Sequence, residues 1–81
     1  MIVSNVGSNM TQVSNTTYTI MLSYNTPVVV FDASNNKLLV TKKKWSATTS
    51  KHITKFRAMY PTNMAVEMID QDTLDSILNS L

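Results

Sequence analysis

Cysteine is absent from this chain of 81 residues, and glycine and histidine each occur once. Without cysteine, neither a disulfide framework nor a thiolate zinc site can compensate for a small core. One glycine and one histidine leave little from which to build an oxyanion hole and an oriented general base. No catalytic, metal-binding or nucleotide-binding motif stands out. We therefore expect a protein that is not an enzyme and that uses no cofactor and no metal.

Long apolar runs are also missing. No stretch approaches the roughly 20 apolar residues needed to cross a bilayer, and the N-terminus lacks the pattern of a signal peptide. We expect an intracellular protein with no membrane partner. Hydrophobic residues make up 43% of the chain and charged residues 15%, which argues against intrinsic disorder. A chain this short buries little surface when it folds, so we also expect a homo-oligomer.

Charge is missing from the first part of the chain and sorted by sign in the rest. Residues 1–31 carry no charged side chain, all lysines and arginines lie between Lys37 and Arg57, and four of the five acidic residues lie in the last fifteen. Sorted charge indicates either a charged partner or pairing between segments. Both alternatives stay open, because the basic helix and the acidic C-terminal segment could also pack side by side.

Two regions follow from composition and hydrophobic period. Residues 1–16 are rich in Ser, Asn and Thr and suggest an N-terminal arm, which could add a strand to its own sheet or to that of a neighbouring subunit. Residues 17–81 form a single small α+β domain. Its first part alternates or is β-branched over 17–24, 27–32 and 37–41, which predicts a three-stranded antiparallel meander.

The rest of the domain is expected to add a helix, a short fourth strand and a C-terminal helix. The first helix begins at a cap supplied by Ser46, Thr48 or Thr49 and ends at Pro61. The strand covers 64–69, and the last helix is capped by Asp70 or Asp72. The predicted order is βββαβα, with both helices on one face. The predicted core consists of Ile20, Leu22, Val28, Val30, Leu38, Val40, Ile53, Phe56, Val66, Leu74, Ile77 and Leu78.

Two short motifs resemble a known family. Ser23-Tyr24-Asn25-Thr26 is followed about twenty residues later by Trp45-Ser46-Ala47-Thr48-Thr49-Ser50-Lys51-His52-Ile53. The pair resembles a family of small, functionally uncharacterised proteins of bacteriophages and other mobile elements, which often have a SYNT strand and an aromatic-S-x-T-T-S-K-H-I-N helix start. The resemblance covers about residues 22–56, with Thr54 in place of Asn and a longer N-terminal arm. It implies a phage origin, and hence the host cytoplasm, and an α+β core, but no activity.

The strongest candidate site is the basic segment between the third strand and the first helix. Its partner-binding candidates are Lys42, Lys43, Lys44, Trp45, Lys51, Lys55 and Arg57. Lysines beside a tryptophan and a helix N-terminus could bind the phosphates and bases of a nucleic acid. The segment could equally bind an acidic protein surface. We favour a non-enzymatic phage accessory protein that binds a host protein, for host takeover or against host defence, with nucleic-acid binding as the alternative.

Three other clusters have simpler explanations. Thr48 to Lys51 imitates a Ser-x-x-Lys site, but these hydroxyls are expected to start the helix. Asp70, Asp72 and Asp75 lack the spacing of a calcium loop and suit the start of a helix better. His52 is expected to be a packed or hydrogen-bonded residue of the helix.

Overall fold

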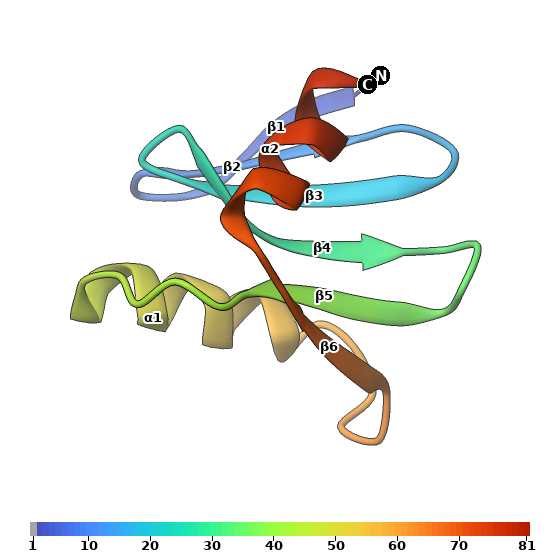
Figure 1. The fold of residues 1–81 in the computed structure, drawn as a ribbon. Helices are drawn as coiled ribbons and strands as arrows, with labels where there is room; N and C mark the ends of the chain where they lie inside the picture. The colour runs from blue at the N-terminus through green and yellow to red at the C-terminus, as the bar shows by residue number, and fades with distance from the viewer. Residues whose placement is uncertain (1) are drawn as a thin grey trace.

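The computed structural model describes residues 2–81 and contains six strands and two helices (Figure 1). In chain order they are β1 (Ile2–Gly7), β2 (Met10–Ser14), β3 (Tyr18–Ser23), β4 (Thr26–Asp32), β5 (Lys37–Thr41), α1 (Ala47–Arg57), β6 (Ala65–Ile69) and α2 (Gln71–Asn79). Neither helix, in the part of the chain described, has the length and apolar character needed to cross a membrane.

All six strands belong to one sheet, and they follow one another in chain order from β1 to β6. Strands β1 to β5 pair antiparallel through short turns, in which Asn9, Tyr24, Asn25 and Asn36 have positive φ. Positive φ at the centre of a tight turn matches the twist of the flanking strands, and asparagine tolerates it better than most residues. Strand β6 pairs parallel to β5, since the connection through α1 returns the chain to the level of the first residue of β5.

The predicted three-stranded meander and the order βββαβα are wrong, because the sheet has six strands and is mixed. Residues within the segment suggested as an arm form β1 and β2 of the same sheet. Strand β2 buries Met10 on one face and Val13 on the other. A strand that is buried on both faces does not show a simple alternation of apolar and polar residues, so its pattern was not recognised.

The two helices cover opposite faces of the sheet, which corrects the prediction that both lie on one face. Phe56 of α1 packs in a core cluster with Met21, whereas Leu74 of α2 packs in a second cluster with Ile20. Met21 and Ile20 are neighbours on β3, and successive side chains of a strand point to opposite faces. The long apolar run of β4, which is buried on both faces, follows from this three-layer arrangement.

All of the predicted core residues except one are buried or half-buried. Val66 is 39% exposed because β6 is an edge strand that α1 does not cover. Buried hydrophobic residues absent from the predicted core are Met10, Val13, Met21, Val29, Leu39 and Ile69.

Helix α2 is fixed to the sheet by its first residue. The Gln71 side chain donates from Nε2 to the carbonyl oxygen of Pro27, at 2.6 Å, and its Oε1 accepts from the Thr41 hydroxyl, at 2.9 Å. One residue therefore links α2 to both β4 and β5. Asp70 occupies the N-cap position, as expected, but its side chain makes no capping hydrogen bond.

Candidate partner-binding groove

The two sequence motifs meet at a buried polar cluster between β3 and α1. The Ser23 hydroxyl of β3 lies 3.0 Å from the Thr49 hydroxyl and 2.7 Å from Nδ1 of His52. All three side chains are buried. Ser46 caps α1 by accepting a hydrogen bond from the backbone N–H of Thr49, at 3.3 Å. The cluster therefore fixes the start of α1 against the end of β3.

The chemistry of this cluster suits a structural role. A hydroxyl can donate and accept at once, so Ser23 can donate to an unprotonated Nδ1 of His52 while it accepts from Thr49. If the imidazole is protonated on both nitrogens, Ser23 can accept from it and donate to Thr49. The Ser23 side chain is only 2% exposed, which leaves no room for a substrate at its oxygen. His52 is thus a buried, hydrogen-bonded residue of the helix.

A groove runs between α1 and the edge strand β6. Helix α1 packs over β3 and β4, so the apolar side chains of β6 on the same face stay uncovered. Val66 is 39% exposed and Met68 is 51% exposed. Two adjoining hollows of about 350 and 470 Å³ share Thr54 of α1 as a lining residue. Together they form what we call the α1–β6 groove.

The floor of the groove is apolar, the α1 wall also carries the hydroxyls of Ser50 and Thr54, and basic side chains lie near both ends. The floor consists of Leu38, Val40, Val66 and Met68 on the two parallel strands. One end is lined by Lys42, Lys43, Lys44 and Trp45, and the other by Arg57, Ala58, Pro61, Thr62 and Met64. The structure thus brings five of the seven predicted partner-binding residues to one groove.

Lys51 and Lys55 do not line this groove. They are four residues apart and therefore share one side of α1, whereas Ser50, Thr54 and Arg57 lie on the groove side. The Lys55 ammonium group approaches Gly7 at the end of β1 instead. The six basic candidates consequently form two separate surfaces, one on each side of α1.

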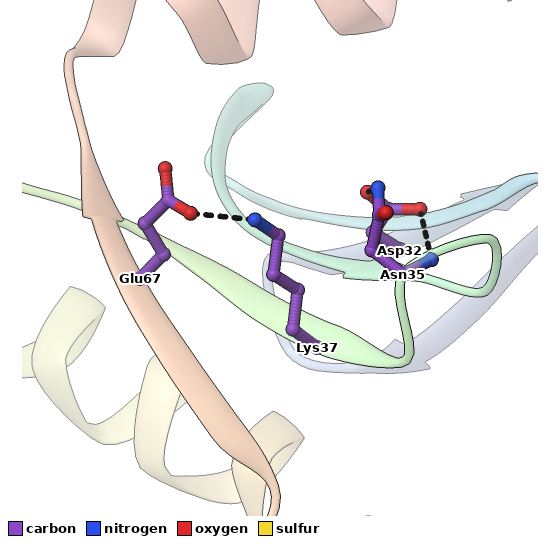
Figure 2. Close-up of polar contacts among 4 residues, drawn as sticks. All are labelled: Asp32, Asn35, Lys37 and Glu67. Carbon is purple, nitrogen blue, oxygen red and sulfur yellow. Dashed lines mark hydrogen bonds and ion pairs between the residues drawn. The ribbon is translucent and has the colours of Figure 1, made fainter.

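Part of the sorted charge is paired internally across β5 and β6. Lys37 Nζ lies 2.6 Å from Glu67 Oε1 (Figure 2), and this hydrogen bond raises the pKa of Lys37. Lys42 forms a second, more exposed ion pair with Asp70, at 3.7 Å. Within residues 2–81, Lys43, Lys44 and Arg57 form no ion pair. The uncompensated positive charge of the groove therefore comes from these three residues.

Two further acidic residues, Asp32 and Asp75, have hydrogen-bond partners within the fold. Asp32 accepts from the backbone N–H of Ser34 and from the side chain of Asn35, which holds the turn between β4 and β5 (Figure 2). Asp75 accepts from Gln71 at 3.2 Å. No cluster of three metal-ligating side chains occurs among the residues that the structure describes.

Trp45 lies at the basic end of the groove and packs partly against the core beneath α1. The Lys43 ammonium group lies 4.3 Å from the centre of its ring, which is within cation–π distance. The indole Nε1 is buried and has no hydrogen-bond partner. The Trp45 side chain therefore covers part of the core, and the Lys43 ammonium group occupies one face of its ring.

The apolar floor was missed from the sequence. Val66 was predicted as core, and Met68 was not singled out, because the pattern of β6 indicates a strand but not how much of it a helix covers. That coverage depends on the angle at which α1 crosses the sheet, and no local signal encodes it.

Comparison with known proteins gives a family but no function. No curated protein and no solved structure matches the chain significantly. A model of a protein family of unknown function, DUF8033, matches residues 1–76, which is nearly the whole chain. The chain therefore belongs to this uncharacterised family.

Proposed function

We propose that this protein is a non-enzymatic binding module that holds an extended, acidic and apolar segment of a partner protein in the α1–β6 groove. The observation that carries the proposal is an apolar floor, open along an edge strand, with unpaired cations near both ends. Exposed apolar surface next to polar groups is a feature of protein interaction sites.

The backbone of β6 supports binding of an extended segment. Its residue Ile69 accepts a hydrogen bond from the N–H of Lys42, at 2.8 Å, so the polar groups of Ile69 point toward β5. In a strand paired in parallel, these groups point alternately to the two sides. The N–H and C=O groups of Val66 and Met68 therefore point outward, where a partner strand could pair with them.

The charge of the groove supports an acidic partner. Lys43 and Lys44 at one end and Arg57 at the other form no ion pair within residues 2–81. Complementary charge near the rim of an interface increases the association rate and selects the partner. We expect acidic side chains to flank the apolar residues of the bound segment.

Nucleic-acid binding is less well supported by the same geometry. The basic residues lie on two sides of α1, and the floor between them and β6 is apolar, whereas protein–nucleic acid interfaces are polar and strongly positive. Lys43 covers one face of the Trp45 ring, which reduces the surface available for stacking a base.

The class of partner follows from the sequence resemblance. Similarity to small phage proteins supports a phage accessory protein whose partner is a host protein in the host cytoplasm. This part of the proposal depends on the motifs of residues 22–56, not on the groove.

Selection from a displayed library of random peptides tests the groove. We expect enriched peptides to combine acidic and apolar residues and to lose binding to Met68→Asp, which adds a like charge to the floor. Lys55→Gln, on the other side of α1, is the matched control and should bind normally. Peptides without acidic enrichment, or equal binding to Met68→Asp, would overturn the proposal. Tight binding of a single-stranded oligonucleotide in its place would support the nucleic-acid alternative.

A further inference from the structure

The other edge of the sheet has a different character. Strand β1 pairs only with β2, so its outer side presents unpaired backbone groups. Its first described residues are strongly exposed, with Ile2 at 67% and Val3 at 62%. Val3 continues the row formed by Val13 of β2 and Ile20 of β3 on the face that α2 covers.

Strand β1 has only one of the usual protections of an edge strand, a register shift between Asn5 and Gly7 at its C-terminal end, and the exposed residues Ile2 and Val3 lie before it. Natural edges carry charged residues or proline, or are covered by a loop or helix. Strands β1 and β2 contain neither a charged residue nor a proline, and the first charge in the chain is Asp32. The β6 edge differs, since Glu67 lies at its centre.

We propose that β1 pairs antiparallel with β1 of a second copy of this chain, so that two sheets join across a twofold axis. Such an interface is self-complementary, because each copy presents the same apolar and uncharged strand. A symmetric pairing of β6 centred on its middle residue would instead place the two Glu67 side chains opposite each other, which is destabilising. The charge pattern therefore selects β1 over β6 as the edge that meets a second copy.

The dimer has a consequence for binding. Strands β1 and β6 are the two opposite edges of the sheet, so pairing through β1 leaves both α1–β6 grooves free at the outer ends. Each copy in the dimer would contribute one groove. A partner that contains two binding segments could occupy both grooves at once, which increases avidity. The dimer itself does not depend on the function proposed for the groove.

Light scattering during size-exclusion chromatography tests the interface. We expect a concentration-dependent mass that approaches twice the 9.1 kDa of one chain. Val3→Lys should shift the protein to the monomer, because like charges meet across the twofold axis. Val66→Lys on the opposite edge is the matched control and should remain a dimer. Circular dichroism verifies that both variants fold.

The absence of cysteine allows a second measurement. Single cysteine substitutions at Val3, Ser4 and Asn5 are tested for disulfide-linked dimers under mild oxidation. In a twofold antiparallel pair, crosslinking should be strongest at the position nearest the axis and weaker at its neighbours. A wild-type monomer at the highest concentration, or a dimer broken by Val66→Lys and not by Val3→Lys, would overturn the proposal.

Discussion

The Ser23 hydroxyl of β3 and the His52 imidazole of α1 lie 2.7 Å apart although they are 29 residues apart in the chain. The bond joins a SYNT segment at the end of a strand to a TTSKHI segment at the start of a helix, with Thr49 as the third member. The two sequence motifs at residues 23–26 and 45–53 therefore have a structural explanation at these three positions. These hydrogen bonds attach the start of α1 to β3.

The polar cluster should contribute measurably to stability. Ser23→Ala leaves the Thr49 hydroxyl and His52 Nδ1 without their partner in a buried site, and an unsatisfied buried polar group costs about 1–3 kcal/mol. Urea unfolding should show this loss, and Thr49→Ala should also destabilise the fold. The exposed Thr48→Ala is the control. Equal stability of Ser23→Ala and wild type would show that the cluster contributes nothing.

The start of α1 should depend on Ser46. Its side chain accepts the Thr49 backbone N–H, so Ser46→Ala removes the cap and should cost about 1 kcal/mol. Thermal unfolding followed by circular dichroism measures the loss. Ser46→Asp retains an acceptor and should keep most of the stability. If Ser46→Asp is as unstable as Ser46→Ala, the capping bond is not the cause.

The N-terminal strands should behave as part of the core. Met10→Ala removes a side chain that is 3% exposed, and such truncations cost about 2–5 kcal/mol. Val66→Ala, on the uncovered part of β6, should cost much less. Urea midpoints of the two variants make the comparison. A small effect at Met10 together with a large effect at Val66 would contradict the described packing.

Stability should fall at alkaline pH. Burial raises the pKa of the Tyr60 phenol above its ordinary value of 10.0, and the nearby Thr19 side chain acts in the opposite direction. A hydrogen bond to Glu67 raises the pKa of Lys37 above 10.5. The unfolded chain loses both protons first as pH rises, so the stabilisation is complete below about pH 10 and decreases above it.

Two variants separate the contributions to this alkaline loss. Tyr60→Phe has no phenol to ionise, and Glu67→Gln removes the charge that favours protonated Lys37. Urea unfolding between pH 8 and 11 should show a weaker pH dependence in each variant than in wild type, over a range set by the ordinary pKa values near 10. An unchanged slope in both variants would rule out these two groups as its source.

Binding of acidic peptides should depend on the cations of the groove and not on those across α1. Replacing Lys43, Lys44 and Arg57 with Gln removes the unpaired charges near the groove and should weaken binding while the fold is retained. Lys51→Gln with Lys55→Gln, compared with Lys43→Gln and Lys44→Gln alone, is the control that removes the same number of charges. Fluorescence anisotropy with a selected peptide measures the difference at two salt concentrations, because exposed charges are screened by salt. Equal losses in both variants would assign the effect to net charge alone.

Local pattern was sufficient for much of the secondary structure. The three strands over 17–41, the helix after Ser46, the strand at 64–69 and the C-terminal helix all correspond to observed elements, since each has a clear period or a cap. Strands β1 and β2 were not recognised, because the segment of residues 1–16 that contains them is rich in Ser, Asn and Thr and because β2 is buried on both faces.

By itself, the sequence determined the type and approximate position of the helices and strands after residue 17. It also determined the uncharged N-terminal third and the separation of basic from acidic segments. Only the tertiary structure decided that the helices lie on opposite faces and that Val66 and Met68 stay exposed. It also decided that Lys51 and Lys55 lie apart from the basic residues of the groove, which are Lys42, Lys43, Lys44 and Arg57. The physical reason is that periodicity and capping depend on neighbours a few residues away. Coverage of a sheet depends on which strands a helix crosses, and that depends on contacts between residues far apart in the chain, such as Ser23 and His52.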